Sequence, residues 1–203
     1  KYKIYINVGD QKIYFYTSTN FENDINNLLA SLTVIGIFKN ICKLNKNIFY
    51  NHKKPEGRGD ISRIKINRKN IYLIDESYNS NPLSLKSAIK NFDTLKVNSS
   101  KKHLILGDML ELGKHSKKLH SGISAIINNS SINYVNVFGK DIIKTYKNIH
   151  ENKKGVILKT NSQIIHLIKN DINNNDYLMI KGSNSTGLHK LTKFLKVGKI
   201  NVL

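Results

Sequence analysis

Apolar and polar side chains alternate along the first sixteen residues in two short runs. Residues 2–7 (YKIYIN) and 12–16 (KIYFY) each follow a two-residue period, and Gly9 and Asp10 lie between them. A two-residue period places the apolar side chains on one face of a strand, and a glycine between two such runs favours a tight turn. The pattern predicts a β-hairpin.

A helical period replaces this alternation after a polar loop. The run from Ile25 to Phe38 (INNLLASLTVIGIF) has apolar residues at helical spacing and small residues in its middle, which predicts a buried helix. A shorter, polar helix is expected near residues 40–49. The segment 51–60 (NHKKPEGRGD) then concentrates charge, proline and glycine, which is typical of a boundary between domains.

Strand and helix patterns alternate regularly after this boundary. Strands are predicted at 61–67, 71–75, 102–107, 133–138, 156–159 and 177–181, and helices at 83–95, 116–128, 140–149, 161–170 and 186–196. Arg68, Lys69 and Asn70 join the first two strands, so this pair should be a hairpin. The rest indicates an α/β fold, Rossmann-like, whose mostly parallel sheet carries helices on both faces.

Polar loops follow four of these strands, in LIDESYNSNP (73–82), LILGDMLELG (104–113), VFGK (137–140) and MIKGSNSTGLHK (179–190). Each alone also fits an ordinary strand–turn–helix corner, in which Asn81 caps a helix and Pro82 takes its first position. In a parallel sheet, however, all four loops meet at one edge. Acidic side chains there can hold a ribose, and lysines and helix starts can hold an anion. The sequence therefore predicts a nucleotide-sized or anionic ligand.

The charge balance is strongly basic, with 33 Lys and Arg against 14 Asp and Glu and a formal net charge of +19. Such a balance is compatible with a nucleic acid, a membrane surface or phosphorylated substrates as partner. Because the lysines are scattered, and Asn, Ile and Tyr are abundant too, compositional drift accounts better for most of the charge. Neither a G-x-x-x-x-G-K-[ST] phosphate loop nor a G-x-G-x-x-G motif occurs.

The remaining reactive residue types point to no other site. Cys42 is the single cysteine, which excludes an internal disulfide and fits a reducing cytoplasm. The histidines are dispersed without zinc spacing, and a surface or packing role suits His115 and His120 better than a ligand role. No apolar run is long enough to span a bilayer, and no signal peptide is evident.

Four motifs together resemble the C-terminal part of the Mur ligases. They are PEGRGD (55–60), IDESYNSNPLSLKSAI (74–89), LGDMLELGKHS (106–116) with His120, and IKGSNS (180–185). Y-N-x-N-P and G-D-M-x-E-L-G resemble the branch of this family that adds D-alanyl-D-alanine. The resemblance implies a C-terminal Mur ligase domain at 55–203. Residues 1–54 resemble the end of the family's central ATPase domain.

This resemblance implies an ATP-dependent amide ligase of peptidoglycan synthesis. In such an enzyme, UDP-N-acetylmuramoyl-tripeptide is activated by ATP as an acyl phosphate, and the amine of D-alanyl-D-alanine displaces the phosphate. The family's phosphate loop, Mg²⁺ ligands and carbamylated lysine would lie upstream of Lys1. We therefore expect this chain to be a C-terminal portion, inactive by itself, of a cytoplasmic monomer without nucleic-acid partners or membrane insertion.

The matching motifs imply residues for ATP. Arg58 is expected to approach the phosphates or ribose as the catalytic residue of this portion. Asp75 and Glu76 resemble an Asp-Asp pair, one member of which holds the ribose, and the choice between them stays open. The remaining ATP contacts implied by the resemblance are Tyr78, Asn79 and Asp24.

The motifs also imply contacts with the other substrates. Residues expected to face them are Asn79, Asn81, Asp108, Lys181 and Ser183. Three positions depart from the family pattern: Asn23-Asp24 stand where His-Asn is usual, Ser80 replaces the alanine of Y-N-A-N-P, and the arginine common soon after the serine of the Lys-Gly-Ser loop is missing. The first departure leaves the adenine contact open.

Two other functions compete with this one. A ligase of the same superfamily, such as a meso-diaminopimelate-adding ligase or a folylpolyglutamate synthase, would share the domain but not both signatures. A basic, non-catalytic nucleic-acid-binding domain would account for the net charge, although no nucleic-acid motif accompanies it.

Overall fold

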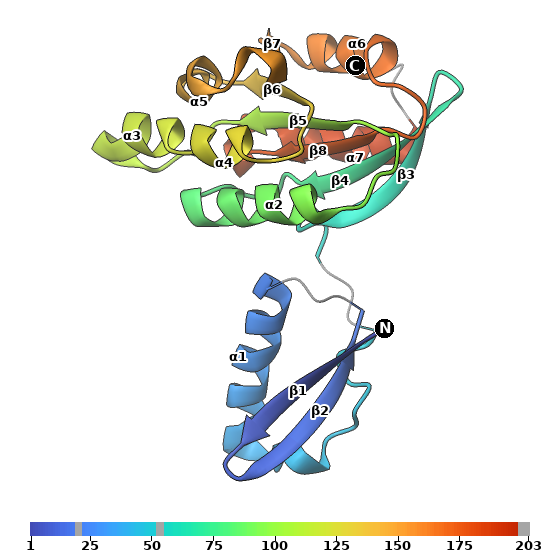
Figure 1. Ribbon diagram of the computed structural model, residues 1–203, viewed down its shortest axis with the longest axis vertical. Coiled ribbons are helices and arrows are strands. Elements are labelled where there is room, and N and C mark those ends of the chain that lie inside the picture. The colour runs from blue at the N-terminus through green and yellow to red at the C-terminus, as the bar shows by residue number, and fades with distance from the viewer. Residues whose placement is uncertain (19–21, 52–54, 199–203) are drawn as a thin grey trace. The chain divides into compact units, whose positions relative to one another are not determined.

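The computed structural model describes residues 1–18, 22–51 and 55–198 (Figure 1). The chain divides into two compact units, Lys1–Lys54 and Pro55–Leu203. In the described part of the chain, no helix has the length and apolar character needed to cross a membrane.

The first unit consists of a β-ribbon and one long helix. Strands β1 (Tyr2–Val8) and β2 (Gln11–Thr17) pair antiparallel, and helix α1 spans Glu22–Phe38. Phe15 of β2 packs against Leu28 and Leu32 of α1. The predicted hairpin and the predicted helix are both confirmed.

Two expectations for this unit are wrong. Helix α1 is not buried: Leu28 and Leu32 are, but Ile37 and Phe38 are 74% and 79% exposed, because the two-stranded ribbon provides only one apolar surface to pack on. The polar helix near 40–49 is only the 3₁₀ turn η1 (Ile41–Lys43) followed by turns. Its N-cap Asn40 accepts a hydrogen bond from the amide of Cys42, a local bond that competes with an α-helix.

The second unit is built on a six-stranded sheet in the order β3-β4-β8-β5-β6-β7. Strand β3 is antiparallel to β4, and the other neighbours are parallel. The strands are β3 (Asp60–Ile66), β4 (Lys69–Glu76), β5 (Lys102–Gly107), β6 (Tyr134–Phe138), β7 (Lys154–Leu158) and β8 (Tyr177–Lys181).

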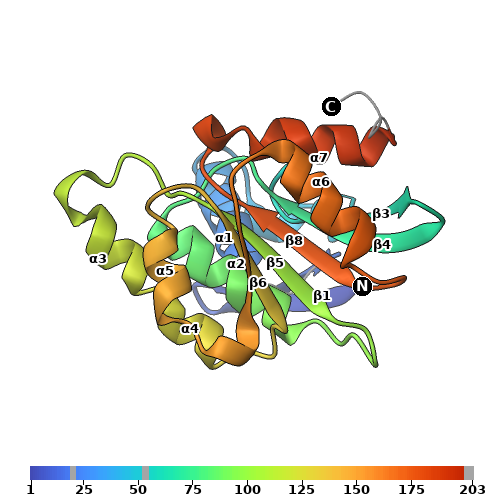
Figure 2. The same ribbon diagram turned by 90° about the horizontal axis from the view of Figure 1, so that it is seen from above.

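Helices cover both faces of this sheet (Figure 2). Helices α6 (Asn161–Asn170) and α7 (Leu188–Val197) bury apolar side chains on one face. The other face packs against α2 (Pro82–Thr94), α4 (Ser124–Asn128) and the segment around α5 (Ile143–Asn148). All six residues of β5 are buried, as expected for a central strand covered on both sides. The α/β fold predicted from the sequence is confirmed.

Two local predictions need correction. The hairpin between β3 and β4 turns at Asn67 and Arg68, both with positive φ (46° and 67°), whereas Lys69 and Asn70 already belong to β4. A two-residue turn of this kind matches the twist of the paired strands.

The second correction concerns the helix predicted at 116–128. It is interrupted between α3 (Ser116–Ser121) and α4, after a 3₁₀ turn η2 (Gly113–His115). Gly122 lies at the break, and the Ser124 hydroxyl donates to the carbonyl of Ser121, which is a local alternative to helical bonding. Two further 3₁₀ turns, η3 (Glu151–Lys153) and η4 (Asn184–Thr186), complete the unit.

Candidate functional site

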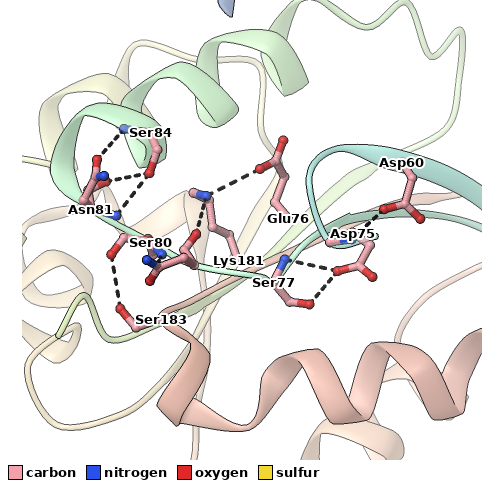
Figure 3. A network of polar contacts seen from close by, with 11 residues as sticks. Asp60, Asp75, Glu76, Ser77, Ser80, Asn81, Ser84, Lys181 and Ser183 are labelled. Carbon is pink, nitrogen blue, oxygen red and sulfur yellow. Dashed lines mark hydrogen bonds and ion pairs between the residues drawn. The ribbon is translucent and has the colours of Figure 1, made fainter. Parts of the chain in front are cut away.

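The four predicted loops do meet at the carboxyl edge of the sheet. Parallel strands β4, β8, β5 and β6 end side by side with Glu76, Lys181, Gly107 and Phe138. Antiparallel β3 begins at the same edge, because Asp60 pairs with Asp75. Figure 3 shows the polar side chains that these strand ends bring together.

The loop after β4 is held in shape by its own polar groups. Asn81 caps α2 by accepting from the amide of Ser84, whose hydroxyl accepts from the amide of Asn81 in return, and Pro82 begins the helix, as predicted. The Asn79 side-chain oxygen accepts from the amide of Ser80. The buried Ser80 hydroxyl has no hydrogen-bond partner among the described residues.

Lys181 is a buried cation at the centre of this edge, with a side chain only 2% exposed. Its ammonium lies 3.0 Å from the Asn79 carbonyl oxygen and 3.4 Å from a carboxylate oxygen of Glu76. Burial lowers the pKa of Lys181, and the nearby Arg58 also lowers it, while Glu76 acts in the opposite direction. Lys181 therefore fastens the end of β8 to the loop after β4.

Ser183 connects three of the loops. Its hydroxyl donates to the Ser80 carbonyl at 3.1 Å and accepts from the Leu110 amide at 2.8 Å, and its own amide donates to the Asp108 carbonyl. The Asp108 carboxylate in turn accepts from the backbone amides of residues 140, 141 and 142. Asp108 thus holds the loop after β6, and the substrate contact implied for it stays a prediction.

The acidic pair at the end of β4 occupies two different environments. Asp75 is 2% exposed, and one of its carboxylate oxygens accepts from the amide and hydroxyl of Ser77 while the other contacts Lys196. Burial alone would raise the pKa of Asp75, but the hydrogen bonds from Lys196 and Ser77 outweigh it and lower the pKa. Glu76 is 21% exposed and lies beside Lys181.

Arg58 and Tyr78 form the exposed part of the edge. The Arg58 guanidinium carbon lies 4.5 Å from the centre of the Tyr78 ring, which is cation–π distance. Tyr78 is 48% exposed, and its carbonyl accepts from the Asn184 side chain. A cationic plane and an aromatic ring are therefore both accessible to a ligand.

The structure adds residues that the sequence interpretation missed. They are Thr192 and Lys196, both on α7. The Thr192 hydroxyl lies 3.0 Å from the Ser77 hydroxyl, and the Lys196 ammonium bridges Asp60 and Asp75. Their spacing of four residues, which places both on one face of a helix, is a signal that was available in the sequence.

Two further predictions concern the first unit and metals. Asp24 lies in the first turn of α1, in the other unit, and the Asn23 side chain falls outside what the structure describes. Among residues 1–18, 22–51 and 55–198, no group of three or more His, Cys, Asp or Glu side chains is arranged to hold a metal ion.

The second unit is thus an α/β domain whose mostly parallel sheet carries a cationic, partly aromatic site at its carboxyl edge. The model of the family described as "Mur ligase, glutamate ligase domain" matches residues 62–184. The chain belongs to the Mur ligase family, and the resemblance seen in its motifs is confirmed.

Curated relatives from several bacteria carry the same description, UDP-N-acetylmuramoyl-tripeptide–D-alanyl-D-alanine ligase. The Bacillus subtilis protein is 31% identical over 128 residues, which cover 62% of this chain and 28% of that protein. The protein of Buchnera aphidicola subsp. Baizongia pistaciae is 30% identical over 203 residues, covering 96% of this chain and 40% of that protein. The chain therefore spans well under half the length of these relatives.

A solved structure shows the same fold. The MurF ligase of Thermotoga maritima, crystallised in complex with ADP, aligns with a TM-score of 0.75 at 18% identity, over 95% of this chain and 42% of that one. At this identity, the match supports the architecture of the chain.

Proposed function

We propose that this chain is the C-terminal portion of an ATP-dependent ligase that adds D-alanyl-D-alanine to UDP-N-acetylmuramoyl-tripeptide. The observation that carries the proposal is the convergence of the branch signatures at one edge, where Arg58 stacks on Tyr78 near the buried Lys181. The descriptions of the curated relatives support the same reaction. Residues 1–54 would complete the end of a central ATPase domain, and the protein would act as a cytoplasmic monomer.

The exposed part of the edge suits a nucleotide. A guanidinium can pair with phosphate oxygens, and an aromatic ring offers a flat apolar surface. Of the two acidic residues, Glu76 is our candidate for the ribose, because its side chain is 21% exposed whereas Asp75 is buried. When bound, ATP would supply the phosphoryl group that activates the tripeptide carboxylate.

Other groups at the edge would orient the remaining substrates. Asn79 is exposed beside Tyr78 and is our candidate for a polar contact with the incoming peptide. Asn81, Lys181 and Ser183 are engaged within the fold, so their part is to hold the loops in place. Fixed loops lower the entropy that must be lost when two substrates meet.

Among the described residues, no group of three or more His, Cys, Asp or Glu side chains could hold a metal ion. Within this proposal, the ligands of Mg²⁺ come from outside the chain.

The test uses the full-length protein that contains this chain. Phosphate release from ATP is followed with UDP-N-acetylmuramoyl-tripeptide, with and without D-alanyl-D-alanine, for the parent and for Arg58→Ala. Arg63→Ala is the matched control, because Arg63 is also an exposed arginine near a tyrosine, 5.9 Å from the ring centre of Tyr72. We expect release that requires the dipeptide, falls in Arg58→Ala and persists in Arg63→Ala.

The same assay separates the competing functions. Release that depends on a single amino acid instead of the dipeptide would assign the chain to another ligase of the superfamily. Release indifferent to any acceptor would refute the proposed reaction. Salt-sensitive binding of nucleic acid without any acceptor-dependent release would favour the basic binding domain instead.

A further inference from the structure

Lys196 contacts two carboxylates at once from the last described helix. Its ammonium lies 2.5 Å from an oxygen of Asp60 and 2.6 Å from an oxygen of Asp75. Lys196 is separated along the chain from Asp60 by 136 positions and from Asp75 by 121 positions. Lys196 lies outside residues 62–184, the range that matches the family model.

The Lys196 ammonium offsets the repulsion between the carboxylates of Asp60 and Asp75. Asp60 and Asp75 are direct partners across the antiparallel β3–β4 pair, and Figure 3 shows them side by side. Like charges directly opposite each other destabilise a sheet. The second oxygen of each is already engaged, in Asp60 with the amide of Gly57 and in Asp75 with Ser77. A single ammonium therefore neutralises the pair on its remaining oxygens.

The same pair fixes the backbone that carries Arg58. The Asp60 carboxylate accepts a hydrogen bond from the amide of Gly57. The Gly57 carbonyl accepts from the amide of Tyr78, and the Asp75 carbonyl accepts from the amide of Gly59. Gly57 and Gly59 have φ of +76° and +86°, so this loop adopts a conformation that few residues favour. Its shape depends on the anchors at both of its ends.

Helix α7 supplies two anchors from one face. Thr192, one turn before Lys196, lies 3.0 Å from the Ser77 hydroxyl, which bonds Asp75. In contrast, Lys193 points to a different face, where it is 63% exposed and 3.7 Å from the exposed Glu56. An exposed ion pair of this kind contributes little to stability.

We propose that Lys196 is a positioning residue of the ligase, holding the Gly57–Asp60 loop so that Arg58 stays stacked on Tyr78. The effect of Lys196 on catalysis rests on the proposed function, whereas its effect on the loop does not. Lys196 itself does not touch a substrate.

The experiment compares Lys196→Met, Lys196→Arg and the matched control Lys193→Met in the full-length protein. Backbone hydrogen exchange of peptides covering 57–60 and 76–80 reports on the loop, and circular dichroism reports on folding. For Lys196→Met we expect at least ~10-fold faster exchange in both peptides. Lys196→Arg should restore protection, because a guanidinium can also bridge two carboxylates.

Kinetics then separate positioning from mere stability. We expect Lys196→Met to raise the KM for ATP by ~10-fold. In an Arg58→Ala background the same substitution should change this KM by less than ~2-fold, since the loop then has no guanidinium to position. Lys193→Met should change neither exchange nor KM.

Three outcomes would overturn the inference. They are unchanged exchange in Lys196→Met, equal effects of Lys196→Met with and without Arg58, and no recovery in Lys196→Arg. Should Lys196→Met fail to fold, Lys196→Arg and Thr192→Val carry the same comparison at the two anchors. Failure of the proposed function would look different, because the parent itself would then release no phosphate in response to the dipeptide.

Discussion

Replacing Ser183 by alanine removes the one hydroxyl that connects three loops of the site. The Ser80 carbonyl would lose its donor, and the Leu110 amide would lose its acceptor. Ser183 is 5% exposed, so water cannot replace the hydroxyl freely at this position. The substitution changes a single oxygen atom and leaves the apolar packing of the edge intact.

The cost follows from the two orphaned groups. A buried polar group left without a partner costs about 1–3 kcal/mol. The Ser80 carbonyl is buried and should show this full cost, whereas the Leu110 amide is only partly buried and regains some hydration. We therefore expect Ser183→Ala to lower the free energy of unfolding by about 2–3 kcal/mol. In a chain of this size, that is a fall in Tm of roughly 4–12 °C.

Thermal unfolding followed by circular dichroism measures this loss, with Ser185→Ala as control. Ser185 is exposed in the same loop, and its substitution should stay within about 0.5 kcal/mol of the parent. Because the chain has two units, exchange of the Leu110 amide proton is needed to assign the loss to this site. A loss below about 0.5 kcal/mol in Ser183→Ala, with unchanged exchange at Leu110, would refute the bridging role.

Two further predictions concern neighbouring groups. Ser80→Ala should raise the free energy of unfolding by up to ~1 kcal/mol, because it removes a buried hydroxyl without a partner among the described residues; a loss in thermal unfolding would show a hidden partner. Since its pKa is lowered in the fold, Asp75 stabilises the protein above the unfolded value of 3.8, and this contribution disappears as pH falls through the lower folded pKa. Stability measured from pH 6 downward should thus fall more steeply in the parent than in Asp75→Asn, and parallel curves would contradict this.

Local patterns were sufficient where the cause is local. The Asn81 cap and Pro82 at the start of α2 follow from the chemistry of adjacent residues. The alternation of strands and helices implied a parallel sheet, and parallel strands bring their loops to one edge whatever their order. The gathering of the four loops was therefore predictable before any strand order was known.

The hydrophobic pattern gave wrong predictions where the structure depends on tertiary packing or on a local hydrogen bond. The composition of α1 is that of a buried helix, but the ribbon beneath it buries only one side. Helical spacing over 116–128 continues across Gly122, although the backbone breaks there. A hydrophobic period describes what could be buried, and only the neighbouring elements decide what is.

The sequence by itself determined the fold class, the family and the edge of the sheet that carries the site. The tertiary structure alone decided which lysine pairs with each acid of Asp75-Glu76: Lys196 contacts Asp75, and Lys181 contacts Glu76. Lys196 meets its partners across more than a hundred residues of chain, and no local period or motif encodes such a distance. Side chains far apart in sequence become one electrostatic unit only when the sheet and its last helix have packed.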